Sequence, residues 1–200
     1  RTEHMIHFTN ESCDLDVADA LALLEFACKD DARPHLGVGI CDAGNLCATD
    51  GHSLLVMRLE DAGKGSRAHR NQVWSHAYVK TQVAVAKATK TTVRLMYSAF
   101  TGKFPPVNQV IPEPGFGVEK TRKVRGKDES TIETTLTPVG FNPMYVARIT
   151  KVCDALSDSK SKSRQPGCQL VALRGEFDPL RFEVKANGRE ATVVIMPMRI

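Results

Sequence analysis

The stretch CATDGHSLLVM, Cys47 to Met57, places a turn dipeptide shortly before an apolar run. Asp50-Gly51 between two apolar segments is typical of a β-hairpin, so the residues on either side predict two successive antiparallel strands. A second apolar run, VVIMPMRI, covers residues 193–200. Such a run is unfavourable in water unless it packs against something, and we therefore expect it to lie against another part of the fold.

The segments around this hairpin predict further antiparallel strands. LGVGICD and NLCAT are expected to pair around Ala43-Gly44, and TTVRLMYS adds another strand. LRFEVKA and EATVVIMPM flank Asn187-Gly188, a dipeptide strongly favoured in two-residue hairpin turns. Polar stretches predict loops at 61–71 and 157–167, and a linker between Pro112 and Ser130.

Three segments have the apolar spacing of amphipathic helices: residues 14–29, residues 75–90, and a third that starts after Asn142. The third has the clearest start, because Asn142 can cap it and Pro143 suits the first helical position. One helix followed by antiparallel strands recurs along the chain, which predicts an α+β fold. The expected apolar stripes are Val17, Leu21, Leu24 and Cys28, then Val79, Val83 and Ala86, then Tyr145, Ile149, Val152 and Leu156.

The composition is that of a globular protein without membrane segments. Apolar residues make up 42% of the chain and charged residues 25%. No run approaches the roughly 18 apolar residues of a membrane span, and RTEHMIHF at residues 1–8 lacks a signal-peptide core. The net charge of +4 permits an anionic partner such as nucleic acid without arguing strongly for one.

The six cysteines contain no CxxC pair and no regular disulfide framework. Several lie inside apolar stretches, where a free thiol behaves as a small hydrophobic side chain. Free thiols are typical of a reducing compartment, so we expect a cytoplasmic protein. The cysteines are Cys13, Cys28, Cys41, Cys47, Cys153 and Cys168.

No catalytic template fits the sequence. The histidines and cysteines lack zinc-ligand spacing, and His4 and His7 are read as strand residues rather than metal ligands. DAGKGSR lacks the first glycine of a phosphate-binding loop, and no Gly-x-Ser-x-Gly elbow occurs. We therefore predict no catalytic residue, no metal and no cofactor, and an enzyme is the least favoured class.

Three separated motifs resemble one family, the bacterial DNA polymerase III beta subunit, or DNA sliding clamp. ATDGHSLLV is similar to its Ala-Thr-Asp-Gly-His-Arg-Leu-Ala segment, and VVIMPMRI to its terminal Val-Val-Met-Pro-Met-Arg-Leu. GKFPPVNQVIPE, Gly102 to Glu113, resembles the segment that closes the middle domain of the clamp. KDDARPHLGVGI and VGFNPMYVARITKVCDAL show weaker similarity. The order of the three motifs makes the resemblance specific.

The resemblance implies a DNA-clamp fold in a shortened homologue. Residues 1–113 resemble the middle clamp domain, and 114–200 the second half of the last domain. In the family, such domains close into a ring around duplex DNA, with helices lining the hole and contacting phosphates without reading sequence. The acidic first helix, with Asp14, Asp16, Asp19 and Glu25, suits that role poorly, and solvated helix faces would explain the basic residues equally well. The residues that would face DNA are Lys80, Lys87, Lys90, Arg148 and Lys151.

The resemblance also implies a pocket between the two domains for short peptides of polymerase and repair proteins. Methionine gives such a pocket an adaptable floor, and Gly51 allows close backbone approach. Ser53 and Gln109 stand where the family has arginines, so peptide selectivity is expected to differ; ordinary core and turn positions are the other interpretation. The pocket residues would be Thr49, Gly51, His52, Leu54, Pro105, Val110, Val194, Met196, Pro197, Met198 and Arg199.

Two functional hypotheses follow from the resemblance. The first is a homo-oligomeric processivity factor of DNA replication, which encircles DNA and tethers partner proteins. A ring of twelve half-domain units would take four such chains, or three if residues 114–136 hold a fourth half-unit. The second is an adaptor or decoy that binds clamp-binding peptides without holding DNA.

Overall fold

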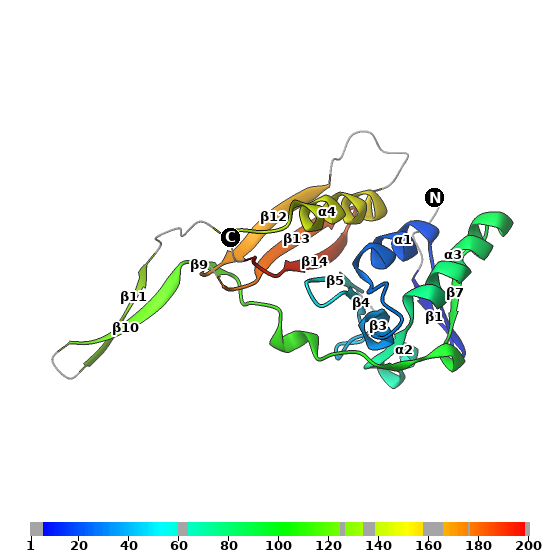
Figure 1. Cartoon of the computed structure of the whole chain (residues 1–200), viewed down its shortest axis with the longest axis horizontal. Helices are drawn as coiled ribbons and strands as arrows, with labels where there is room; N and C mark the ends of the chain where they lie inside the picture. Colours follow the sequence, from blue (N-terminus) through cyan, green and yellow to red (C-terminus); the bar gives the residue numbers. More distant parts are fainter. Residues whose placement is uncertain are drawn as a thin grey trace.

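The computed structural model describes residues 6–59, 64–124, 127–133, 139–157, 166–175 and 177–198. Its main feature is a nine-stranded, almost entirely antiparallel sheet with three helices on one face (Figure 1). Helix α1 (Val17–Phe26) lies in the middle of this layer and packs against both α3 (His76–Thr89) and α4 (Pro143–Leu156). The α+β prediction is therefore confirmed.

The large sheet has the strand order β8-β6-β3-β4-β5-β14-β13-β12-β9. Neighbouring strands pair antiparallel except β12 and β9, which pair in parallel over two residues. The strands are β3 (Val38–Ile40), β4 (Leu46–Thr49), β5 (Ser53–Arg58), β6 (Gln72–Trp74), β8 (Gly102–Lys103), β9 (Gly115–Phe116), β12 (Gly167–Leu173), β13 (Leu180–Ala186) and β14 (Arg189–Ile195).

The two apolar runs of the sequence meet at the centre of this sheet. Strand β14 pairs with β5 from Ser53↔Ile195 to Arg58↔Glu190. Side chains alternate between the two faces of a strand, so Leu55 packs in the cluster under the helices, while Leu54 packs in a second cluster on the opposite face. Both faces are covered here, which explains why β5 reads as continuously apolar instead of alternating.

The helix predictions are largely confirmed at their ends. The Ser75 side chain accepts a hydrogen bond from the Tyr78 amide, and Asn142 caps α4 by accepting one from the Met144 amide. Lys90 closes α3 in the left-handed conformation, with φ of 54°. Helix α1, however, begins at Val17, because Asp14 belongs to a strand that precedes it.

The apolar stripe predicted for α1 is partly wrong. Leu21 is 39% exposed, whereas Leu23 and Phe26, outside the predicted stripe, are fully buried. The reason is the position of α1 between two other helices, which buries more than one of its faces. The spacing of apolar residues along one face of a helix does not reveal that its other faces are covered as well.

One hydrophobic core extends across residue 113, the boundary expected between two domains. Leu23 from α1, Leu55 from β5 and Val152 from α4 belong to the same buried cluster. An ion pair joins Asp19 of α1 to Arg189 at the start of β14, with nitrogen–oxygen distances of 2.9 Å. The two parts of the chain are therefore physically joined by sheet, core and charge.

The polar stretches differ from their predictions. Residues 61–71 contain a short helix, α2 (Lys64–Ala68), in their described part, and most of the predicted loop at 157–167 lies outside the described residues. In place of a linker, the chain forms β9 and then a ribbon of β10 (Val118–Val124) and β11 (Lys127–Glu133). This ribbon projects from the body of the molecule (Figure 1). A small separate sheet consists of β1 (His7–Phe8), β2 (Ser12–Leu15) and β7 (Val93–Met96).

Candidate functional site

The three segments that carry the resemblance come together on the sheet face opposite the helices. Leu54 pairs with Val194 in the β5–β14 register, and the Met196 amide donates to the His52 carbonyl at 2.9 Å. Leu54 and Val194 belong to an apolar cluster with Phe104 and Val107. Leu54, Val194 and Met196, three of the residues expected to line one pocket, thus lie in one region of the sheet, although Leu54 is far from the other two in sequence.

A hollow of about 500 Å³ lies at the edge of this cluster, and we call it the linker hollow. Val110 and Met196 line it, while Leu54 and Val194 are buried in the adjoining cluster. Its volume is in the range of ligand sites. The full lining is Gln109, Val110, Ile111, Pro112, Glu113, Arg174, Asp178, Pro179 and Met196.

The linker hollow contains charged residues that the sequence reasoning missed. Arg174 and Asp178 come from the connection between β12 and β13, and the Arg174 guanidinium donates to the Pro114 carbonyl at 3.3 Å. Phe177, between them in the chain, is an exposed aromatic side chain. No sequence motif indicated this connection, because contacts between distant residues bring it beside the segment 109–113: the pairing of β12 with β9 and the hydrogen bond from Arg181 to the Pro112 carbonyl.

A second apolar surface lies beside the first turn of α4, and we call it the Met198 surface. The Met198 amide donates to the Gly140 carbonyl at 2.8 Å, which holds the segment after β14 against the residues that precede α4. Met198, Phe141 and Met144 are all exposed, Met144 to 66%. Phe141 and Met144 were not expected to contribute to a site. Both apolar side chains nevertheless precede Tyr145, the first residue of the predicted apolar stripe.

The turn at Asp50-Gly51 is held by hydrogen bonds within the segment 49–53. Thr49 Oγ1 donates to the Ser53 carbonyl at 2.8 Å, and Asp50 Oδ1 accepts from the amides of His52 and Ser53 at 2.9 and 2.8 Å. Gly51 has φ of 89°, a conformation that favours glycine. Thr49 and Gly51 therefore shape the turn, and they do not line the linker hollow.

Arg148 binds this turn from α4 and is not available as a free DNA-facing cation. Its Nη1 lies 2.6 Å from Asp50 Oδ2 and 2.7 Å from Ser53 Oγ, and its guanidinium packs over the Tyr145 ring at 4.8 Å. Burial would raise the pKa of Asp50, but hydrogen bonds from Arg148 and from the His52 and Ser53 amides outweigh it and lower the pKa. Sequence reasoning placed Arg148 on a helix face; its turn partner became visible only in the fold.

The other expected DNA-facing residues lie on the outer surface of the helix layer. Lys80, Lys87 and Lys90 are exposed on α3, and Lys151 is exposed on α4. The acidic character expected of the first helix is smaller than predicted. Asp14 lies in β2 and pairs with Arg94 at 2.8 Å, while Asp19 is buried against Arg189.

The remaining expected pocket residues are dispersed around these surfaces. Pro105 is half-buried next to Phe104, His52 is exposed with its ring stacked 6.3 Å from the Tyr145 ring, and Pro197 lies between Met196 and Met198. Arg199 lies outside the described residues, as does His4, while His7 is in β1.

Other site types were also sought among the described residues. They contain no group of three or more histidine, cysteine, aspartate or glutamate side chains placed to hold a metal ion. None of the helices in the described ranges has the length and apolar character needed to cross a membrane. All six cysteines are free thiols. No protein-family model matches the sequence, and a search of curated proteins also finds no match.

Proposed function

We propose that this protein is a sliding-clamp-like processivity factor, which assembles with copies of itself around duplex DNA in the cytoplasm and tethers polymerase or repair proteins through a peptide-binding pocket. The observation that carries the proposal is the meeting of three distant segments in the apolar cluster that contains Leu54, Val107 and Val194, with the linker hollow at its edge. The resemblance is carried by segments that are far apart in the chain, and the fold brings them to one place.

The chemistry of the two surfaces suits a short peptide with two apolar anchors. One anchor would enter the linker hollow between Val110 and Met196, and the other would lie on the Met198 surface. Flexible methionine side chains adapt to different anchors. Arg174 supplies a cation at the hollow, which is also lined by Gln109, one of the two positions where the resemblance had led us to expect arginine.

The helix layer supports contact with DNA phosphates. Lys80, Lys87 and Lys151 are exposed there, and two carboxylates that argued against this role, Asp14 and Asp19, are neutralised by arginines. Attraction of lysines to phosphates is nonspecific and weakens with salt, as sliding requires.

A second candidate function is a peptide-binding adaptor that does not encircle DNA. It is favoured by residues 115–124 and 127–133, which form strands and no helix, so they do not supply the fourth half-unit of a three-chain ring. Engagement of Arg148 with Asp50 also removes one of the expected cations from the helix layer.

The pocket is tested by replacing Met196 and Met198 with alanine, together and singly. We expect the double variant to bind a fluorescent peptide with leucine and phenylalanine anchors about tenfold or more weakly, because truncating central apolar contacts typically costs this much. The measurement is fluorescence anisotropy at constant ionic strength. Val85→Ala provides a matched control, since Val85 is an exposed apolar residue on α3, outside both surfaces.

Circular dichroism and thermal unfolding would first establish that each variant is folded. Peptide affinity unchanged in a folded double variant would overturn the assignment of the pocket. Equal losses in the double variant and in Val85→Ala would show that binding depends on general stability and would also refute the assignment.

A further inference from the structure

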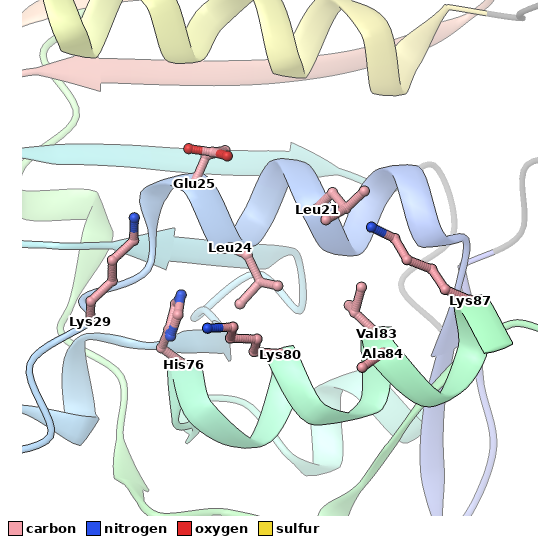
Figure 2. A pocket seen from close by; sticks show the side chains of 9 residues that line it. All are labelled: Leu21, Leu24, Glu25, Lys29, His76, Lys80, Val83, Ala84 and Lys87. Atoms are coloured by element: carbon pink, nitrogen blue, oxygen red, sulfur yellow. The ribbon is translucent and has the colours of Figure 1, made fainter.

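A groove runs along the outer surface of the helix layer between α1 and α3, away from the linker hollow, and we call it the α1–α3 groove (Figure 2). Its volume is about 410 Å³. On α3 the groove follows one face of the helix from His76 to Lys87. The eleven rises of about 1.5 Å between these residues give a length of about 16 Å. The lining is Leu21, Leu24, Glu25, Lys29, His76, Lys80, Val83, Ala84 and Lys87.

The floor of the α1–α3 groove is apolar. Leu24 and Val83 are nearly buried at its base, and Leu21 stands above them with 39% of its surface exposed. Leu21 belongs to the helical stripe that the sequence predicts to be covered, yet the described chain leaves it open to solvent. An apolar partner would remove this surface from water, with a gain proportional to the area covered.

The rim of the groove is basic. Lys29, His76 and Lys80 lie near one end and Lys87 near the other, with Glu25 as the acidic member of the lining (Figure 2). Within the described residues, the side chains of Lys29, Lys80 and Lys87 form no ion pair. Burial lowers the pKa of His76, and the charges of Lys29 and Lys80 lower it further, while those of Asp31 and Glu25 act in the opposite direction.

From this combination we propose that the α1–α3 groove binds an acidic amphipathic helix of a partner protein. About three turns of helix match the length of the groove. Leucines along one side of such a helix would cover Leu21 and Leu24, and flanking glutamates would pair with Lys80 and Lys87. Duplex DNA would satisfy the lysines but would leave the apolar floor uncovered, so the observations favour a peptide. The inference does not depend on the linker hollow, because the two sites share no residue.

The probe is a fluorescent synthetic peptide of about four helical turns, with leucines on one face and glutamates flanking them, measured by anisotropy against the whole protein. Leu21→Glu and Lys80→Glu are each expected to weaken binding on the order of tenfold, the first through lost apolar contact together with charge repulsion and the second through charge repulsion. Lys151→Glu is the matched control, because it makes the same charge change at an exposed position on α4, outside the groove.

A second peptide with lysines in place of the glutamates should not bind. The proposal is overturned if folded Leu21→Glu binds the acidic peptide as the unsubstituted protein does, or if Lys151→Glu loses as much affinity as Lys80→Glu. It is also overturned if the affinity for the acidic peptide depends on Lys80 but not on Leu21, measured with Leu21→Asn, since the groove would then attract anionic groups without using its apolar floor. Peptide binding at the linker hollow and retention on DNA are measured separately, so failure here is distinguishable from failure of the proposed function.

Discussion

At the scale of single residues, the Asp50–Arg148 pair has the most structural consequence. Asp50 accepts hydrogen bonds from its own turn and from α4, so it connects the hairpin of the opening motif to the helix that precedes the C-terminal strands. Ser53, where the family resemblance leads one to expect arginine, is hydrogen-bonded by Arg148 at 2.7 Å. Arg148 of α4 thus places its guanidinium beside Ser53.

Replacement of Arg148 by methionine should therefore destabilise the fold. We expect the free energy of unfolding to fall by about 2 kcal/mol, because Asp50 loses charged hydrogen bonds while it stays mostly buried. Urea denaturation measures the change, and Lys151→Met on the same helix is the control with an equal change in charge. Equal stability of the two variants would contradict the prediction.

The same pair predicts a dependence on pH. The pKa of Asp50 is lowered in the folded protein from its ordinary value of 3.8, so its contribution is fully present above that value and is lost as the pH falls through the folded-state pKa. Arg148→Met should reduce this acid-side loss, which urea titrations at several acidic pH values would reveal.

At the scale of elements, the turn of the β13–β14 hairpin is hydrogen-bonded to the helix layer. Arg189 at its turn binds both oxygens of Asp19 in α1 and donates to the Ala155 carbonyl in α4 at 3.1 Å. Asn187 Nδ2 donates to the Leu156 carbonyl, and its φ of 53° fits the Asn-Gly turn predicted from the sequence. One turn therefore joins two helices to the sheet.

Arg189→Met should lower the free energy of unfolding by about 3 kcal/mol, because it leaves the fully buried Asp19 carboxylate without this cation. The control is Lys185→Met in the same hairpin, which removes an ion pair to Glu190 in which the lysine side chain is 63% exposed; less than about 1 kcal/mol is expected there. Chemical denaturation measures both. Similar losses of unfolding free energy in the two variants would show that the stabilisation by Arg189 does not depend on the buried Asp19 carboxylate.

At the scale of the whole molecule, the free edge of the large sheet bears on assembly. Strand β12 pairs with β9 only through Ala172 and Leu173, and its first residues, Gly167 to Gln169, are exposed. An edge strand with unused backbone groups readily pairs with another chain. Copies of this protein joined through such edges would extend the sheet and the helix layer together, as the proposed ring requires.

A ring and an adaptor differ in mass and in topology. We expect a stable oligomer in solution, most simply of four chains, that is retained on circular DNA and released when the DNA is cut, since a closed ring slides off a free end. Analytical ultracentrifugation and retention on nicked-circular versus linear DNA measure these two properties. A monomer that binds the anchor peptide would support the adaptor, and equal retention on both DNAs would refute encirclement.

The sequence by itself determined the local features of this protein: the three helices, the cap at Asn142, the Asn187-Gly188 turn, and the strands of the opening hairpin. Each of these depends on neighbouring residues, whose spacing and turn chemistry are visible in the chain. Only the tertiary structure decided which faces of α1 are buried, that residues 115–133 form strands, and that Arg148 binds Asp50. It also placed Arg174 beside Met196 and Lys80 beside Leu24. These outcomes depend on contacts between residues distant in sequence, and local periodicity carries no information about them.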